Sequence, residues 1–158
     1  MAPPLSNVAK GFLLVHILAA LWFATGLLAG SLTRAQGKRA QTAPARLFAS
    51  RLTWRLTKVF TLPGLIAAGL IGAALVTLRG YSFHLGWVFT SMILYLILLV
   101  FVLFFLTPHQ WKTAIAAEAS EGKDPQLAHD LEAKLPAWVE GASALMTLAL
   151  VVLMTIKP

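Results

Sequence analysis

The stretch GFLLVHILAALWFATGLLAGSL, residues 11–32, decides the fold of this chain, because it holds no Asp, Glu, Lys or Arg. A helix of about 20 apolar residues crosses a hydrocarbon core of about 30 Å. Three further stretches, 60–78, 85–106 and 139–156, have similar length and character. We therefore predict an all-α, polytopic membrane protein, in which residues 1–158 form one four-transmembrane-helix bundle with amphipathic cytoplasmic connections.

Composition supports a membrane protein and excludes several other classes. The 158 residues are 58% hydrophobic and only 12% charged, which is too few charges to cover a water-soluble surface. The absence of cysteine excludes disulfides and thiolate sites. The net charge of +7 does not predict a nucleic-acid partner, because the basic residues lie beside the apolar stretches and not among stacking aromatic residues.

The distribution of basic residues predicts the orientation. Seven follow the first span: Arg34, Lys38, Arg39, Arg46, Arg51, Arg55 and Lys58. The second connection holds only Arg79, whereas the third, 107–138, holds Lys112, Lys123 and Lys134. Connections rich in Lys and Arg stay in the cytoplasm, so both termini are expected on the periplasmic, outer side.

Both cytoplasmic connections are predicted to be partly helical. In the first, apolar residues recur every fourth position while Arg51, Arg55 and Lys58 line another face. This pattern is typical of a basic interfacial helix that runs into the second span, and anionic lipid of the inner leaflet is its expected partner. In the second, a surface helix is expected to begin at Asp124–Pro125 and to end at Pro136.

Small residues indicate which helices touch. Gly26 and Gly30 lie four apart on the first span, and Gly64, Ala68 and Gly72 lie four apart on the second. Such faces allow backbones to approach closely, so these two spans are predicted to pack as an antiparallel pair. Pro63 is expected in the first turn of the second span, where its missing N–H costs little.

Ionisable residues at the outer side form the first candidate site. His16 lies within the first span and His84 at the start of the third, with Arg79 and Lys157 at the same membrane face. Two imidazoles at similar depth could bind the iron of haem b, and the two basic residues could pair with its propionates. Alternatively, His84 is an interfacial loop residue and His16 bonds a neighbouring helix.

The inner side offers a second polar cluster, formed by Lys58, His109 and Glu140. A carboxylate and an imidazole at a helix end could relay protons or hold a polar head group. The alternative is that Glu140 reaches the water surface or pairs with a basic neighbour.

Methionine and tyrosine residues within the spans could also carry chemistry. Met92, Met146 and Met154 could be soft copper ligands, although scattered methionines more often fill cores. Tyr95, in the middle of the third span, needs a hydrogen-bond partner, which we expect among Thr25, Ser143 and Thr147.

No catalytic motif of soluble enzymes is present: there is no glycine-rich phosphate loop, no G-x-S-x-G and no H-E-x-x-H. Any enzyme activity would therefore depend on a cofactor held within the membrane, and whether the protein is an enzyme stays open.

Four segments carry a family resemblance: LVHILAALWFATGL (14–27), LTKVFTLPGL (56–65), LEAKLPAW (131–138) and VVLMTIKP (151–158). The chain resembles bacterial four-helix membrane proteins that include HemJ-type protoporphyrinogen oxidases and CopD-type copper-resistance proteins, and most of all an uncharacterised family of predicted integral membrane proteins. The resemblance implies a bacterial inner membrane, His16 as a haem or porphyrin contact, and Lys157 with Pro158 as a terminal pair. The HemJ pattern has a lysine early in the third helix, and this chain has no basic residue from 85 to 106.

Three functional hypotheses follow. The protein binds haem or porphyrin, with HemJ-like redox activity as one form of this reading. Alternatively, it is a non-catalytic accessory subunit that packs against a larger membrane complex or forms a homo-oligomer. The third hypothesis is a copper-handling membrane component.

Overall fold

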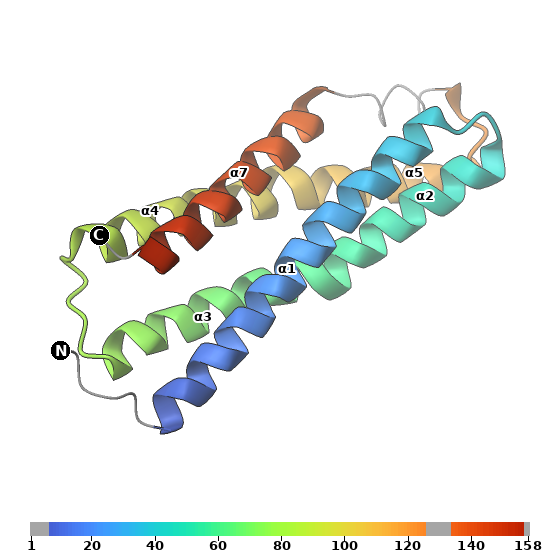
Figure 1. The fold of residues 1–158 in the computed structure, drawn as a ribbon. Coiled ribbons are helices and arrows are strands. Elements are labelled where there is room, and N and C mark those ends of the chain that lie inside the picture. Colours follow the sequence, from blue (N-terminus) through green and yellow to red (C-terminus); the bar gives the residue numbers. More distant parts are fainter. Residues whose placement is uncertain (1–6, 126–133, 157–158) are drawn as a thin grey trace.

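The computed structural model describes residues 7–125 and 134–156, and within these ranges the chain is helical, without a β-strand (Figure 1). The first helix is α1, Asn7–Arg39. The second long segment joins α2, Ala43–Leu56, the π-helical turn η1, Thr57–Thr61, and α3, Leu62–Leu78. The third joins α4, Gly86–Val100, the π-helical turn η2, Phe101–Leu106, and α5, Thr107–Ala119. The last is α7, Lys134–Ile156.

All four segments are long and apolar enough to cross a membrane: Asn7–Arg39, Ala43–Leu78, Gly86–Ala119 and Ala137–Ile156. Large apolar side chains such as Leu70, Phe104 and Leu145 point outward from the bundle. In water this surface would be unfavourable, but in a bilayer it meets lipid tails. The predicted all-α bundle of four membrane-crossing helices is confirmed.

The second and third segments are longer than the predicted spans. They contain 36 and 34 residues, which at 1.5 Å per residue gives roughly 54 and 51 Å. This exceeds a hydrocarbon core of about 30 Å. The surplus is α2 and α5, which continue the spans and pack against each other (Figure 1). The basic stretch that was predicted to be helical forms α2 and η1, which continue into α3. Its basic residues Arg51, Arg55 and Lys58 are exposed.

The third connection differs from its prediction. Residues 107–119 form α5, which ends in a turn with positive φ at Glu121 and Gly122. Most of the surface helix expected between Asp124 and Pro136 lies outside the described residues. Pro136 was expected to end that helix, and this was wrong: it lies in the first turn of α7. A proline is tolerated there because the first N–H groups of a helix have no intrahelical partner.

Each π-helical turn lies directly before a proline. Pro63 lies in the first turn of α3, as expected for the second span, and α3 continues without a break from η1, which ends two residues earlier. Pro108 has the same position after η2. A proline ring clashes with the carbonyl group four residues earlier, which is that of Val59 for Pro63 and of Phe104 for Pro108. Both carbonyls lie in the π turns, whose wider backbone relieves the clash.

Glycine sets the close contact between α1 and α3, which pack as the predicted antiparallel pair. A Cβ on Gly26 would lie 2.6 Å from the backbone N of Thr61, and a Cβ on Gly64 would lie 2.5 Å from the backbone N of Phe23. The small-residue prediction is therefore confirmed at Gly26 and Gly64. Gly30 differs, since nothing lies within 4 Å of its added Cβ.

The bundle consists of two helix pairs, α1 with α3 and α4 with α7. They meet in an apolar core of buried residues: Phe23, Leu27, Leu65, Leu98, Val102, Leu106 and Val139. Towards the end where α1 begins and α7 ends, the pairs separate, and α3 and α4 contact each other at few positions (Figure 1). We call this end, which also carries the 79–85 connection, the terminal end.

Candidate functional site

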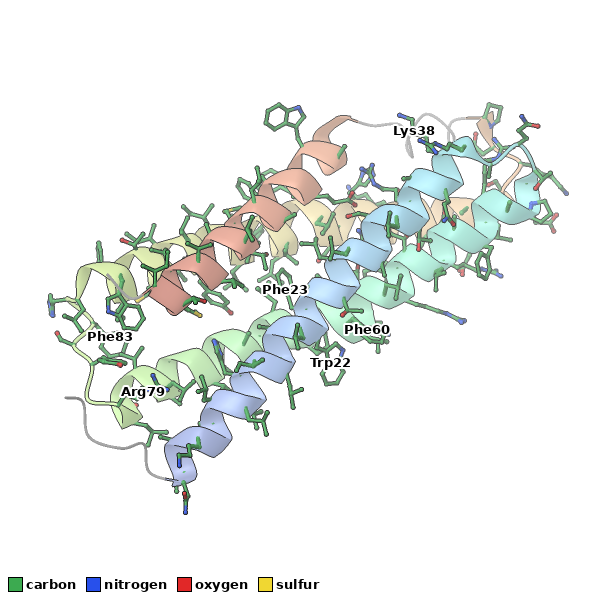
Figure 2. All side chains as sticks on the ribbon, viewed as in Figure 1. Trp22, Phe23, Lys38, Phe60, Arg79 and Phe83 are labelled. Atoms are coloured by element: carbon green, nitrogen blue, oxygen red, sulfur yellow. The ribbon has the colours of Figure 1, made fainter. Side chains whose placement is uncertain are left out.

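A cavity of about 300 Å³ lies between the two helix pairs, on the terminal side of the apolar core. Residues of α1, α3, α4 and α7 line it, and Phe83 of the 79–85 connection lies at its margin. Figure 2 shows Phe23 between the helix pairs, and Phe83 with Arg79 at the terminal end, opposite Lys38. A volume of this size is within the range of small-molecule sites.

The cavity wall is mostly apolar, and its polar groups are the imidazole of His16, the indole N–H of Trp87 and the hydroxyl groups of Ser91, Tyr95 and Thr147. The three hydroxyl groups donate to main-chain carbonyls: Ser91 to Trp87, Thr147 to Ser143, and Tyr95 to Leu65. Their hydrogen-bonding needs are thus met by the helices. His16 is the exception.

The imidazole of His16 is buried, with 9% of the residue exposed. It packs on Gly72 of α3, whose added Cβ would lie 3.0 Å from His16 Cε1, and its polar neighbour is the backbone carbonyl of Ala68. His16 Nδ1 has no hydrogen-bond partner among the described residues. Of the residues that line the cavity, it alone has such a buried, unpartnered side-chain atom. One imidazole nitrogen in an apolar wall can bind a metal centre or accept one hydrogen bond.

The other residues of the predicted outer site lie elsewhere. His84 is an exposed residue of the 79–85 connection; its Nδ1 is 3.5 Å from Ser82 Oγ, and it does not line the cavity. Arg79 follows α3, is half-buried, and also does not line the cavity. Lys157 lies outside the described residues. Among the members of this predicted set that the structure describes, His16 alone lines the cavity.

Two aromatic residues also differ from expectation or from the resemblance. Tyr95 was expected to bond Thr25, Ser143 or Thr147, and this was wrong: its hydroxyl donates to the carbonyl of Leu65 at 3.1 Å and packs on Gly69. Trp22, part of the quoted first-span motif, does not line the cavity. It lies on the lipid-facing side against Phe60, with ring centroids 6.1 Å apart (Figure 2).

A buried ion pair lies on the other side of the apolar core. Arg34 of α1 donates to Glu140 of α7, with Nη2 and Nε at 3.0 and 3.2 Å from Oε2. The two side chains are only 10% and 8% exposed. Ser31 and Gln110 lie near the same carboxylate, whose Oε1 has no hydrogen-bond partner among the described residues. Such a pair is expensive to bury and is therefore held by several helices at once.

The ion pair continues into a polar layer that involves all four helical segments. Thr57, at the start of η1, donates to the side-chain oxygen of Gln110 in α5. Both residues are buried. Arg34, Thr57, Gln110 and Glu140 thus form one connected layer, which we call the polar layer. It lies where each of the four segments passes from apolar to polar sequence.

The predicted inner cluster shares only Glu140 with the polar layer. Lys58 is exposed, and His109 is half-buried with its carbonyl accepting from Thr113. The partner of Glu140 is Arg34, whose charge served only to predict the orientation of the chain in the membrane. A carboxylate one turn inside a span needs a cation at the same depth, and Arg34 at the inner end of the first span offered that signal.

Few side chains of the cavity could ligate a metal ion. The described residues contain no group of three or more His, Cys, Asp or Glu that could hold a metal ion. Two methionines, Met92 and Met154, line the same cavity as His16, whereas Met146 packs against the apolar core. The available donors in the cavity are therefore one imidazole and two thioethers.

Comparison with known proteins shows the family and nothing finer. No curated protein and no solved structure matches the chain. The family model described as "Predicted integral membrane protein (DUF2269)" matches residues 12–158, nearly the whole length. Together with the four membrane-crossing helices, this match shows that the chain belongs to the DUF2269 family of predicted integral membrane proteins.

Proposed function

We propose that this integral membrane protein binds a flat, apolar cofactor of the haem or porphyrin class in the cavity, with His16 as its polar contact. The observation that carries the proposal is the buried Nδ1 of His16, which has no hydrogen-bond partner among the described residues, in a wall whose three hydroxyl groups all donate to main-chain carbonyls. A buried hydrogen-bond acceptor without a partner raises the free energy of the folded protein. A ligand that engages the nitrogen removes this cost.

The residues of the cavity fit haem in part. His16 would hold the iron through its imidazole, and aliphatic and aromatic side chains from four helices would form apolar walls around the ring. His84 does not line the cavity, so the residue that would hold the iron together with His16 is a methionine, Met92 or Met154, through its thioether. Iron–porphyrin with imidazole and thioether ligands supports one-electron transfer. Arg79 at the terminal end, with a buried and unpartnered Nε within the described ranges, is the candidate partner for a propionate.

A reduced-minus-oxidised visible spectrum of the purified protein tests this function. We expect Soret and alpha bands in the natural sequence and their loss in His16→Ala, because the iron then lacks its imidazole. His84→Ala is the matched control and should keep the bands. A folded His16→Ala protein with unchanged bands would contradict the assignment of His16.

Copper handling is the second candidate, and one observation favours it. His16, Met92 and Met154 line one cavity, and imidazole with thioether is a donor set that suits Cu(I). Metal analysis after dialysis separates the two candidates. One copper per chain, lost in Met92→Leu with Met154→Leu and without a Soret band, would support copper over haem.

We also infer the finer location. The excess of Lys and Arg in the connection after α1 favours both chain ends on the periplasmic side of a bacterial inner membrane. Arg55 and Lys58, exposed where α2 enters η1, are then placed beside anionic lipid head groups of the inner leaflet.

A further inference from the structure

The cavity is open at its side, between α3 and α4. These two helices contact each other at few positions (Figure 1). A residue that lines the cavity and is also exposed marks the rim of an opening, and such residues are Ala73 on α3 and Met92 and Leu96 on α4. All three belong to the apolar runs 60–78 and 85–106, so the opening faces the hydrocarbon core of the bilayer. We call it the lateral opening.

The α3 side of the lateral opening carries only small side chains. Between Leu65 and Val76, the residues of α3 that line the cavity are all glycine or alanine: Ala68, Gly69, Gly72 and Ala73. On the side of α1 and α7, Val151 and Met154 are exposed as well, but there α1 contributes the larger imidazole of His16. A flexible chain therefore passes more easily between α3 and α4.

The cavity is closed towards the polar layer. Its floor consists of Phe23, Leu65 and Leu98, which also belong to the apolar core. Tyr95 crosses from α4 to α3 next to this floor, where its hydroxyl donates to the carbonyl of Leu65 at 3.1 Å. The lateral opening is thus bounded on the core side by Tyr95, and Phe83 lies at the opposite margin of the cavity.

An apolar cavity beside lipid favours a hydrocarbon occupant. Water does not stably occupy a site with so few polar groups, and an unfilled space costs its walls the dispersion contacts that a packed neighbour would provide. An acyl chain of an adjacent phospholipid supplies these contacts and stays in apolar surroundings throughout. The cavity volume of about 300 Å³ leaves room for part of such a chain.

Arg79 offers a position for the phosphate of the same lipid. It follows Val76, a lining residue, by three positions, so it lies one turn beyond the cavity on the same face of α3. Figure 2 shows it with Phe83 at the terminal end. Its Nε is buried and has no hydrogen-bond partner among the described residues. A guanidinium group with a donor to spare suits a phosphate oxygen.

We propose that the cavity binds an acyl chain of a phospholipid from the leaflet at the terminal end. The chain enters through the lateral opening, and the lipid phosphate pairs with Arg79. Lipid is then the occupant of the cavity when no cofactor is bound. A cofactor of the haem class would enter by the same route and displace the chain, and that step alone rests on the proposed function.

A photoactivatable lipid tests the binding of the chain. Cofactor-free protein is reconstituted in liposomes that contain phosphatidylglycerol with a diazirine near the end of one acyl chain, and mass spectrometry locates the label after irradiation. We expect label on Phe23 and Ser91, which are buried and line the cavity. Val102 is equally buried but does not line the cavity, and it should carry none.

Variants of α3 test the route. Ala73→Trp places a large side chain at the lateral opening, so most of the label on Phe23 and Ser91 should be lost, and Ala73→Leu should lose less of it. Leu70→Trp is the matched control, because it puts the same side chain on the lipid-facing surface of the same helix. It should leave the label on Phe23 and Ser91 unchanged.

Comparison of two lipids tests the role of Arg79. The anionic phosphatidylglycerol probe should label the cavity about fivefold more than a phosphatidylcholine probe with the same chain, since one basic residue attracts an anionic head group to roughly this extent. Arg79→Gln should abolish this preference, and Arg79→Lys should retain it. An Arg79→Gln protein with the same preference as the natural sequence would contradict the pairing with phosphate.

Two results would overturn the proposal as a whole. One is a folded natural protein that is labelled on lipid-facing Leu145 but not on Phe23 or Ser91. The other is an Ala73→Trp protein with undiminished label in the cavity. The assay uses no haem and no copper, so its failure is distinguishable from failure of the proposed cofactor site, which is measured by spectroscopy.

Discussion

Gly64 lies at a contact between α1 and α3 that leaves no room for a side chain. A Cβ there would lie 2.5 and 2.8 Å from the backbone N and Cα of Phe23, and main-chain atoms cannot rotate away. We expect Gly64→Ala to destabilise the protein by about 1–3 kcal/mol through overpacking. Unfolding in mixed micelles measures the loss.

Gly30→Ala is the matched control for Gly64→Ala, because it makes the same change on a helix with nothing within 4 Å of the added Cβ. Alanine is favoured over glycine within helices, so this variant should be neutral or gain up to about 1 kcal/mol. Equal losses in both variants would show that the α1–α3 contact does not have this geometry.

The ion pair of Glu140 should matter far more to stability than that of Glu118. Glu140 and Arg34 are 8% and 10% exposed, whereas Glu118 and Arg51 are 54% and 49% exposed. Glu140→Gln leaves a cation buried without its counter-ion, so a loss of about 3–5 kcal/mol is expected. Glu118→Gln should cost less than about 1 kcal/mol, since water solvates both partners. Thermal unfolding in detergent compares them, and similar losses would argue that the Glu140 pair is not buried.

At the residue scale, the sequence pointed to two ionisable residues that the structure shows to be buried, but not to the residues that contact them. His16 and Glu140 were recognised because ionisable groups within spans are rare. The residues around Glu140 were missed. The charge of Arg34 is equally consistent with an orientation signal, and Gln110 and Thr57 are neutral residues that give no charge signal. The hydroxyl of Tyr95 donates to the main-chain carbonyl of Leu65. Every residue has such a carbonyl, so the sequence does not indicate which one accepts the bond.

Among the elements, the π-helical turns link the prolines to the polar layer. Pro108 follows η2, and Gln110, two residues later, contacts Thr57 at the start of η1. Pro108→Ala removes the ring clash with the carbonyl of Phe104, so η2 should relax towards a regular α-helix and rotate Gln110 away from Thr57.

Cross-linking in this cysteine-free chain tests that rotation. Cysteines at positions 57 and 110 should be joined by a short bifunctional thiol reagent when Pro108 is present and poorly joined in Pro108→Ala. Cysteines at 22 and 60, the positions of the Trp22–Phe60 ring contact between α1 and η1, serve as the reference because neither lies on α5. Equal cross-linking with and without Pro108 would show that the proline does not set the register of α5.

Element boundaries were only partly predictable. Apolar runs fix where lipid-facing helix must exist, which is why the four spans were found. They do not indicate where a helix ends in water, so the continuation of the third span into α5 was not foreseen, whereas the basic helix that runs into the second span was predicted from its charge pattern. Pro63 was correctly predicted in the first turn of α3, but the rule for isolated helices does not include the π turn that lets the helix continue through the proline, and the same rule wrongly predicted a helix end at Pro136.

For the whole molecule, orientation is the first property to measure. Cysteines introduced at Thr42 and Ser120 should be shielded from an impermeant thiol reagent in intact cells, and a cysteine at Ser82 should react. The reason is the excess of Lys and Arg on one side of the membrane. Labelling at position 42 or 120 would show that the orientation is the opposite of the predicted one.

The cavity is a property of the whole molecule that sequence did not reveal. It exists because the α1–α3 and α4–α7 pairs meet at the core and separate towards the terminal end. Depth along each helix placed His16 and His84 near the same membrane face, but depth does not indicate which side chains face inward. The accessory-subunit hypothesis stays a prediction, and co-purification in mild detergent tests it.

The central claim is that the cavity binds a haem-class cofactor through His16, and titration of cofactor-free protein with ferric haem tests it most directly. We expect a Soret change that saturates at one haem per chain for the natural sequence and for His84→Ala, and at least tenfold weaker binding for His16→Ala. A folded natural protein that shows no saturable change, or a His16→Ala protein that binds equally well, would contradict the claim.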